Sequence, residues 1–100
     1  MKIEDKGNGE LVCFIPERLD VNSADATGEE IMSRLVPGIS HLELDLRDTV
    51  YASSAGLRVF LTCYRKMTGL GGTITLTHVQ PSIMMLLDMT GFTDFLTIQK

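Results

Sequence analysis

The segment TVYASSAGLRVFL, residues 49–61, joins the end of a predicted strand to the start of a predicted helix through a turn that carries two serines. Before this segment, Leu42, Leu44 and Leu46 alternate with polar residues, which is the two-residue period of a strand with one buried face. Beyond the turn, apolar residues fall on one face of a helix, at Leu57, Phe60, Leu61, Tyr64 and Met67. These patterns predict a strand–turn–helix unit.

The two serines have different predicted positions in this unit. Ser53 lies at the N-cap, where its hydroxyl can accept a hydrogen bond from a free backbone N–H of the first helical turn. Ser54 is then the first helical residue, so its hydroxyl lies at the positive end of the helix dipole. Small residues follow, Ala55 and Gly56, and we expect them to leave the surface around Ser54 open to another molecule.

The sequence YASSAGLRVFL, residues 51–61, resembles the signature of the STAS domain (sulfate transporter and anti-sigma factor antagonist), and within that family the bacterial anti-sigma factor antagonists. The likeness covers nearly the whole chain, because IPERLDVNSA and GGTITLTHVQPSIMMLLDMTGF also resemble family segments. The resemblance implies that Ser54 is a phosphorylation site. In the family an aspartate often precedes this serine, and here the preceding residue is Ser53.

Length and composition narrow the class of protein. A chain of 100 residues is enough for one domain, and we predict a single STAS domain over residues 1–100. The net charge of −4 argues against nucleic acid as a partner, because phosphates require a basic surface. The sequence has neither an apolar run of about 18 residues nor a signal-peptide pattern, so we expect a cytoplasmic protein with no membrane partner. Cys13 and Cys63 are isolated and are predicted to be free thiols, with a disulfide as the alternative.

The remaining elements follow from apolar periodicity and from turn residues. In chain order we expect an edge strand around Ile3, a turn at 7–9, a buried strand at 11–15, a helix that begins after Asn22 or Ser23 and stops at Pro37, strands at 41–47 and 73–79, a helix from Pro81 to Gly91 and a last strand at 95–98. This alternation predicts an α/β domain with a mixed, mostly parallel sheet.

The strands at 41–47 and 73–79 each have one polar face. We therefore expect helices mainly on one face of the sheet and a largely solvated opposite face. Gly28, in the first helix, is expected to permit close packing of that helix on the sheet.

A serine at a strand–helix turn is also found in hydrolases as the nucleophile, followed in the chain by an acid and then by a histidine. No Asp or Glu lies between Ser54 and His78, and no histidine follows Asp88 or Asp94. The required order cannot be built, so a small serine hydrolase is a disfavoured alternative. We predict a binding module and not an enzyme.

The histidines show no pattern typical of a metal site. His41 and His78 lack metal-ligand spacing to each other and to a cysteine, and both are expected at surface ends of strands. The glycine-rich residues 69–72 lack the lysine and hydroxyl of a phosphate-binding loop and predict the end of a helix. We therefore expect neither a metal site nor a cofactor.

Residues around the serine turn are candidates for partner binding, and they include Ser53, Ser54 and Gly56. Arg58 lies one helical turn after Ser54, on the same face, where it can pair with a phosphate. Asp20 follows a buried strand and is expected at the same end of the sheet as Ser54. The resemblance favours a place for Asp20 on the docking surface, and a solvated loop carboxylate is the alternative.

The last helix offers a second candidate surface. Its predicted inward stripe, Ile83, Leu86 and Leu87, turns Met85 and Met89 outward. Exposed methionines are adaptable contact residues, so we predict that they extend the partner-binding surface, with self-association as the alternative. We expect a monomer or a weak dimer.

The family resemblance implies a partner switch. The unphosphorylated domain would bind an anti-sigma factor that is also a serine kinase, and this would release a sigma factor. The kinase would phosphorylate Ser54 and so end the complex, and a serine phosphatase would restore it. ATP and Mg²⁺ would belong to these partners. The alternative is a STAS phospho-switch or interaction module of another bacterial signalling system.

Overall fold

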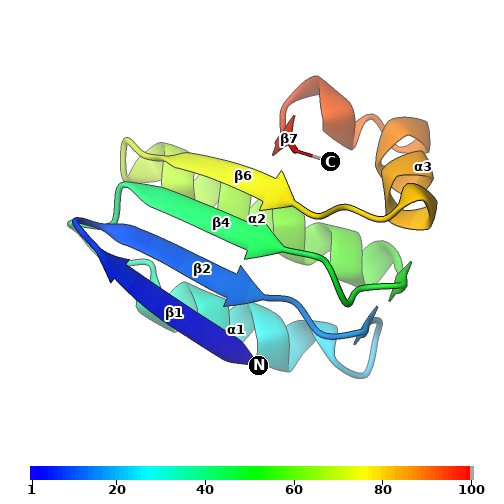
Figure 1. Cartoon of the computed structure of the whole chain (residues 1–100), viewed down its shortest axis with the longest axis horizontal. Helices are drawn as coiled ribbons and strands as arrows, with labels where there is room; N and C mark the ends of the chain where they lie inside the picture. The colour runs from blue at the N-terminus through cyan, green and yellow to red at the C-terminus, as the bar shows by residue number, and fades with distance from the viewer. Residues whose placement is uncertain (100) are drawn as a thin grey trace.

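The computed structural model of the chain, which describes residues 1–99, places a five-stranded sheet in front of two helices (Figure 1). The strand order is β1-β2-β4-β6-β7. The strands of this sheet are β1 (Lys2–Gly7), β2 (Glu10–Phe14), β4 (His41–Asp45), β6 (Thr73–Thr77) and β7 (Thr97–Ile98). A separate two-stranded sheet pairs β3 (Arg18–Leu19) with β5 (Tyr51–Ala52).

The sheet is mixed and mostly parallel, as the sequence predicted. Only β1 is antiparallel, and it forms a hairpin with β2, whereas β2, β4, β6 and β7 are parallel. The hairpin turn has positive φ angles at Gly7, Asn8 and Gly9, and these residue types tolerate that conformation. The turn predicted at residues 7–9 is confirmed.

Within residues 1–99, three α-helices complete the α/β fold: α1 (Ala24–Arg34), α2 (Ser54–Gly69) and α3 (Pro81–Met89). Both α1 and α2 lie behind the sheet, whereas α3 lies beyond the carboxyl end of β6 (Figure 1). The core between the sheet and the first two helices includes Leu42, Leu44, Ile31 and Phe60, all fully buried. No helix within residues 1–99 has the length and apolar character needed to cross a membrane.

The first helix begins after Ser23, one of the two positions at which the sequence predicted its start. The reason given for Gly28 was wrong. A Cβ atom at Gly28 would lie 3.6 Å from Cγ2 of Val59, which belongs to α2. Gly28 therefore faces α2 and not the sheet. A methyl group there would be at ordinary contact distance from Val59, so the packing of α1 on α2 does not require glycine.

The face of the sheet opposite the helices is less solvated than predicted. Asp45 points to this face and yet is only 2% exposed, and Thr75 and Thr77 are also buried. The side chains of Arg47 and His78 contact the Asp45 carboxylate and shield it from water. The last strand is also shorter than the expected 95–98, because residues 95 and 96 form a turn and a bend after the 3-10 helix η1 (Phe92–Asp94).

Candidate functional site

The serine turn is held beside the loop that follows β3. In the small parallel sheet Arg18 pairs with Tyr51 and Leu19 pairs with Ala52. The backbone N–H of Ser53 then donates a hydrogen bond of 3.0 Å to the carbonyl oxygen of Leu19. This pairing brings Asp20, the next residue, alongside the start of α2, as the sequence predicted.

The two serines take the positions predicted for them. The Ser53 hydroxyl accepts a hydrogen bond of 3.3 Å from the backbone N–H of Gly56, and Ser53 is the N-cap of α2. Ser54 is the first residue of the helix and is exposed. Ser53 is therefore occupied in capping the helix, whereas the hydroxyl of Ser54 is accessible from solvent.

Gly56 is buried beneath the turn, and the prediction that it keeps the surface around Ser54 open is wrong. A Cβ atom at this position would lie 2.2 Å from the carbonyl oxygen of Leu19 and 3.1 Å from its carbonyl carbon. Glycine is needed because α2 approaches the backbone of β3 this closely. Gly56 sets the position of the serine turn and offers little surface to a partner.

Asp20 is half-buried and organises its own loop. Its carboxylate accepts hydrogen bonds from the backbone N–H of Asn22 at 3.0 Å and from the side chain of Arg18 at 3.4 Å. The Asn22 hydrogen bond is the main reason that the pKa of Asp20 is lowered; partial burial opposes this effect and Arg18 reinforces it. The carboxylate is therefore ionised at neutral pH and is fixed in position next to the serine turn.

Arg58 is exposed on α2, one turn beyond Ser54. No carboxylate in the described part of the chain lies within ion-pair distance of its guanidinium group. Arg58 and Ala55 also line a groove of about 260 Å³ between α1 and α2, with Asp25 and Glu29 on its opposite side. The groove therefore begins next to the serine turn, at Ala55.

Sequence reasoning missed a group of exposed apolar side chains around the turn. Val21 is 75% exposed, and Val50 and Tyr51 are also exposed. The guanidinium group of Arg18 lies 4.5 Å from the centre of the Tyr51 ring. One feature of the sequence could have indicated this surface: Val21 is an apolar residue in a segment that has neither the helical nor the strand period.

The third helix carries the predicted methionine surface. Met85 is 63% exposed and Met89 is 78% exposed, whereas Ile83 and Leu87 are buried. Both methionines line a hollow of about 480 Å³ together with Val79, Pro81, Met84 and Asp88. The outward orientation is confirmed, and the role in partner binding remains a prediction.

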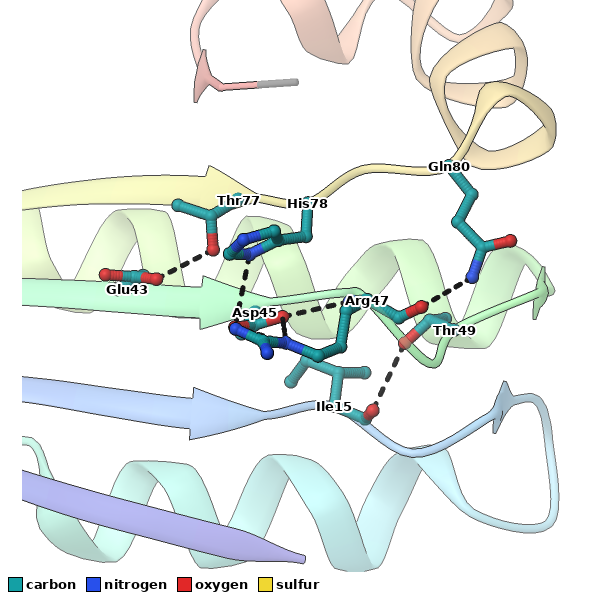
Figure 2. A network of polar contacts seen from close by, with 8 residues as sticks. All are labelled: Ile15, Glu43, Asp45, Arg47, Thr49, Thr77, His78 and Gln80. Carbon is teal, nitrogen blue, oxygen red and sulfur yellow. Dashed lines mark hydrogen bonds and ion pairs between the residues drawn. The ribbon is translucent and has the colours of Figure 1, made fainter.

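A polar network fixes the loop between β4 and β5 that leads to the serine turn (Figure 2). Arg47 binds the Asp45 carboxylate, with 2.7 Å between Nη2 and Oδ2. The side chain of Gln80 donates a hydrogen bond of 2.7 Å to the carbonyl oxygen of Arg47. Thr49 donates to the carbonyl oxygen of Ile15 at 3.2 Å, which ties the same loop to the end of β2. The loop is thus attached on both sides before it reaches Ser53.

The charge of Asp45 depends on this network. Burial raises the pKa of the Asp45 carboxyl, but hydrogen bonds from Arg47 and the charges of His78 and Arg47 outweigh burial, so the pKa is lowered overall. The carboxylate is therefore ionised in the folded protein although it is almost completely buried.

Both cysteines are free, as the sequence predicted, and both are buried. Burial raises the pKa of the Cys13 thiol to about 11 and that of the Cys63 thiol to about 12. Buried thiols that stay protonated are poor nucleophiles, so neither residue is a candidate for redox or nucleophilic chemistry.

The sequence of the chain matches a family model and a known relative. The family model described as "STAS domain" matches residues 2–100. The anti-sigma-B factor antagonist of Bacillus subtilis (strain 168) is 30% identical over 84 residues, which are 84% of this chain and 76% of that protein.

Solved structures share the fold. An anti-sigma-factor antagonist (STAS) domain protein from Planctomyces limnophilus matches with a TM-score of 0.89 at 12% identity, covering 99% of this chain and 88% of that one. The anti-sigma factor antagonist SpoIIAA in its unphosphorylated form matches with a TM-score of 0.76 at 15% identity, covering 99% of this chain and 86% of that one. The phosphorylated form of the Bacillus cell fate determinant SpoIIAA matches with a TM-score of 0.77 at 13% identity, covering 99% and 90%.

Proposed function

The chain belongs to the STAS domain family, and we propose that it is an anti-sigma factor antagonist whose partner binding ends when Ser54 is phosphorylated. One observation carries the proposal. Ser54 presents an exposed hydroxyl at the first position of α2, while the neighbouring Ser53 caps the helix. A kinase can therefore modify Ser54 without removing the cap.

The folded domain should tolerate a phosphate at this position. A phosphate group carries about −1.5 to −2 charges at pH 7, and the N-terminus of a helix is favourable for negative charge. Arg58, exposed one turn further along α2 and free of a carboxylate partner within residues 1–99, is available to pair with it. We expect the fold to stay the same after phosphorylation.

The surface presented to a partner would change much more. The ionised Asp20 carboxylate is fixed next to the serine turn, so a phosphate on Ser54 would add to negative charge already there. Exposed apolar side chains nearby, Val21 and Tyr51, are suited to contact a protein. A partner that covers this apolar surface would then have to bury a dianion against a carboxylate. Burying such charges without partners is unfavourable, so the phosphorylated form should bind more weakly.

We further propose that the partner is an anti-sigma factor with serine kinase activity, and that a serine phosphatase restores the binding form. The name of the Bacillus subtilis relative supports the first part, because it is an antagonist of an anti-sigma factor. SpoIIAA has been solved in a phosphorylated and an unphosphorylated form, and both share this fold. This supports the proposal that phosphorylation controls partner binding.

The test begins with capture of the partner. The purified chain and a Ser54→Ala variant are each incubated with lysate of the source bacterium, with and without ATP and Mg²⁺, and bound proteins are identified by mass spectrometry. We expect ATP to release the partner from the unmodified chain but not from Ser54→Ala. Ser33→Ala, which removes another exposed serine hydroxyl, is the matched control and should behave like the unmodified chain.

The identified kinase then allows a direct measurement. Peptide mapping after incubation with ATP should place the phosphate on Ser54, and calorimetric titration should give weaker binding for the phosphorylated form. Ser54→Asp should weaken binding only in part, because one carboxylate has less charge and fewer acceptor oxygens than a phosphate. Phosphate on Ser53 alone, or equal affinity of the two forms, would refute the proposed switch.

A further inference from the structure

Three side chains of the types that bind metal ions meet on the face of the sheet away from α1 and α2. Glu43 and Asp45 lie two residues apart on β4, so both point to the same face. His78 directly follows β6, whose last residue, Thr77, pairs with Asp45 in the parallel register. One ligand atom from each of the three side chains lies within 4.8 Å of the other two. Figure 2 shows the three groups turned toward one another.

The separations are close to those required by one metal ion. The distance between His78 Nδ1 and Asp45 Oδ2 is 3.2 Å. Two ligand atoms bound to one tetrahedral zinc ion at about 2.1 Å are roughly 3.4 Å apart. The imidazole and the buried carboxylate, which lie within ion-pair distance of each other, therefore already have the spacing of two ligands of the same ion. The ligand atom of Glu43 lies within 4.8 Å of both.

The surroundings of Glu43 also suit a ligand. The hydroxyl of Thr77 donates a hydrogen bond of 2.8 Å to Glu43 Oε2, which holds the carboxylate over β6 and leaves Oε1 for an ion. Hydrogen bonds of this kind orient the ligands of metal sites and affect affinity strongly. His78 has a left-handed backbone, with φ of 53°, and its ring lies back over the sheet (Figure 2).

We propose that Glu43, Asp45 and His78 form a binding site for a divalent first-row transition-metal ion such as Zn²⁺. One imidazole and two carboxylates make a ligand set that suits Zn²⁺ and other divalent first-row transition-metal ions. Three protein ligands leave a fourth position for water or for a group from another molecule. Neither α1 nor α2 covers this face (Figure 1), and the side chain of His78 is 53% exposed, so an ion can approach the site from solvent.

Arg47 acts as a competitor inside the site. Its guanidinium group contacts the Asp45 carboxylate at 2.7 and 3.1 Å and supplies the positive charge that an ion would otherwise supply. Because the Arg47 side chain is 54% exposed, it can move into solvent when an ion binds. The measured affinity should therefore be lower than that of the three ligands alone, and removing the guanidinium should raise it.

This competition gives the experiment its discriminating variant. Titration of the tag-free chain with ZnCl₂ in a calorimeter should give saturable binding of one ion. His78→Ala should lower the affinity by about tenfold or more, whereas Arg47→Gln should raise it. His41→Ala is the matched control, because His41 lies at the other end of β4, with its Nδ1 2.6 Å from the hydroxyl of Thr73, and it should leave the affinity unchanged.

A second readout does not depend on heat. In NMR spectra the imidazole signals of His78 should shift on addition of Zn²⁺, while those of His41 should not. Circular dichroism of each variant checks that it is folded, and the variants avoid the buried Asp45 for that reason. Absence of saturable binding at millimolar zinc, binding that survives His78→Ala, or an Arg47→Gln variant with no gain in affinity would each overturn the proposal. This site does not depend on the proposed phosphate switch, so either can fail alone.

Discussion

Replacing Gly56 by alanine tests the contact that positions the serine turn. The added methyl group would lie 2.2 Å from the carbonyl oxygen of Leu19. Ordinary carbon–oxygen contacts are about 3.3 Å or longer, so the methyl group is roughly 1 Å too close. The Leu19 carbonyl cannot easily move away, because it also accepts the hydrogen bond from the Ser53 N–H.

The expected loss of stability follows from two opposing effects. Forcing an extra methyl group into a packed site costs typically about 1–3 kcal/mol, and a backbone neighbour places this site at the upper end. Alanine in place of a helical glycine gains up to about 1 kcal/mol. We therefore expect Gly56→Ala to lower the free energy of unfolding by about 2 kcal/mol. For a domain of this size that corresponds to a fall in Tm of roughly 8–16 °C.

Gly69→Ala is the matched control. Gly69 is the last residue of the same helix, and no atom lies within 4 Å of the Cβ position. Here only the gain in helix stability remains, so the free energy of unfolding should rise by about 0.5–1 kcal/mol. Urea unfolding followed by circular dichroism measures both variants. If Gly56→Ala is as stable as Gly69→Ala, the close approach of α2 to β3 is refuted.

Three further predictions concern the cap, the exposed methionines and the thiols. Ser53→Ala should lower the free energy of unfolding by about 1 kcal/mol in urea titrations, because the cap on α2 is lost; an unchanged value would contradict the cap. Met85→Glu combined with Met89→Glu should weaken binding to the captured partner in calorimetry and leave Tm nearly unchanged, whereas a large fall in Tm would mean that these side chains belong to the core. The pKa values of Cys13 and Cys63 are raised from 9 to about 11 and about 12 in the folded state, so their contribution to stability is complete well below pH 9 and is lost as the pH rises through these values. By pH 10 the two thiols together should have lowered the free energy of unfolding by about 3 kcal/mol. The variant with alanine at both positions should therefore lose less stability between pH 7 and pH 10 in urea titrations. An equal loss in the variant would contradict the raised pKa values.

The sequence was sufficient to predict the elements that depend on local periodicity and on turn chemistry. The strand at 41–47, the Ser53 cap and the glycine-rich hairpin at 7–9 were all predicted, because each depends on neighbours within a few residues. The parallel sheet followed from the alternation of strands and helices.

The shared sheet edge placed Asp20 near the serine turn correctly, but individual atomic contacts between segments distant in sequence could not be predicted in this way. Gly56 was assigned to an open surface, since nothing in its own segment indicates that Leu19 lies over it. In the same way, the spacing of the histidines was compared only with each other and with the cysteines, and His78 is distant from Glu43 and Asp45 in the sequence. They meet only because β4 and β6 pair in a register that sets Asp45 beside Thr77.

A phosphate on Ser54 would change the surface that a partner contacts and would leave the interior of the domain unchanged. Within residues 1–99 every buried side-chain nitrogen or oxygen already has a hydrogen-bond partner, so the interior holds no side-chain donor for new phosphate oxygens. Ser53 is committed to Gly56, and Asp20 is committed to Asn22 and Arg18. A phosphate on Ser54 would therefore find its donors among the N–H groups of the first helical turn, Arg58, water and any partner. With the interior already satisfied, the change in free energy would fall on the complex with that partner and not on the fold.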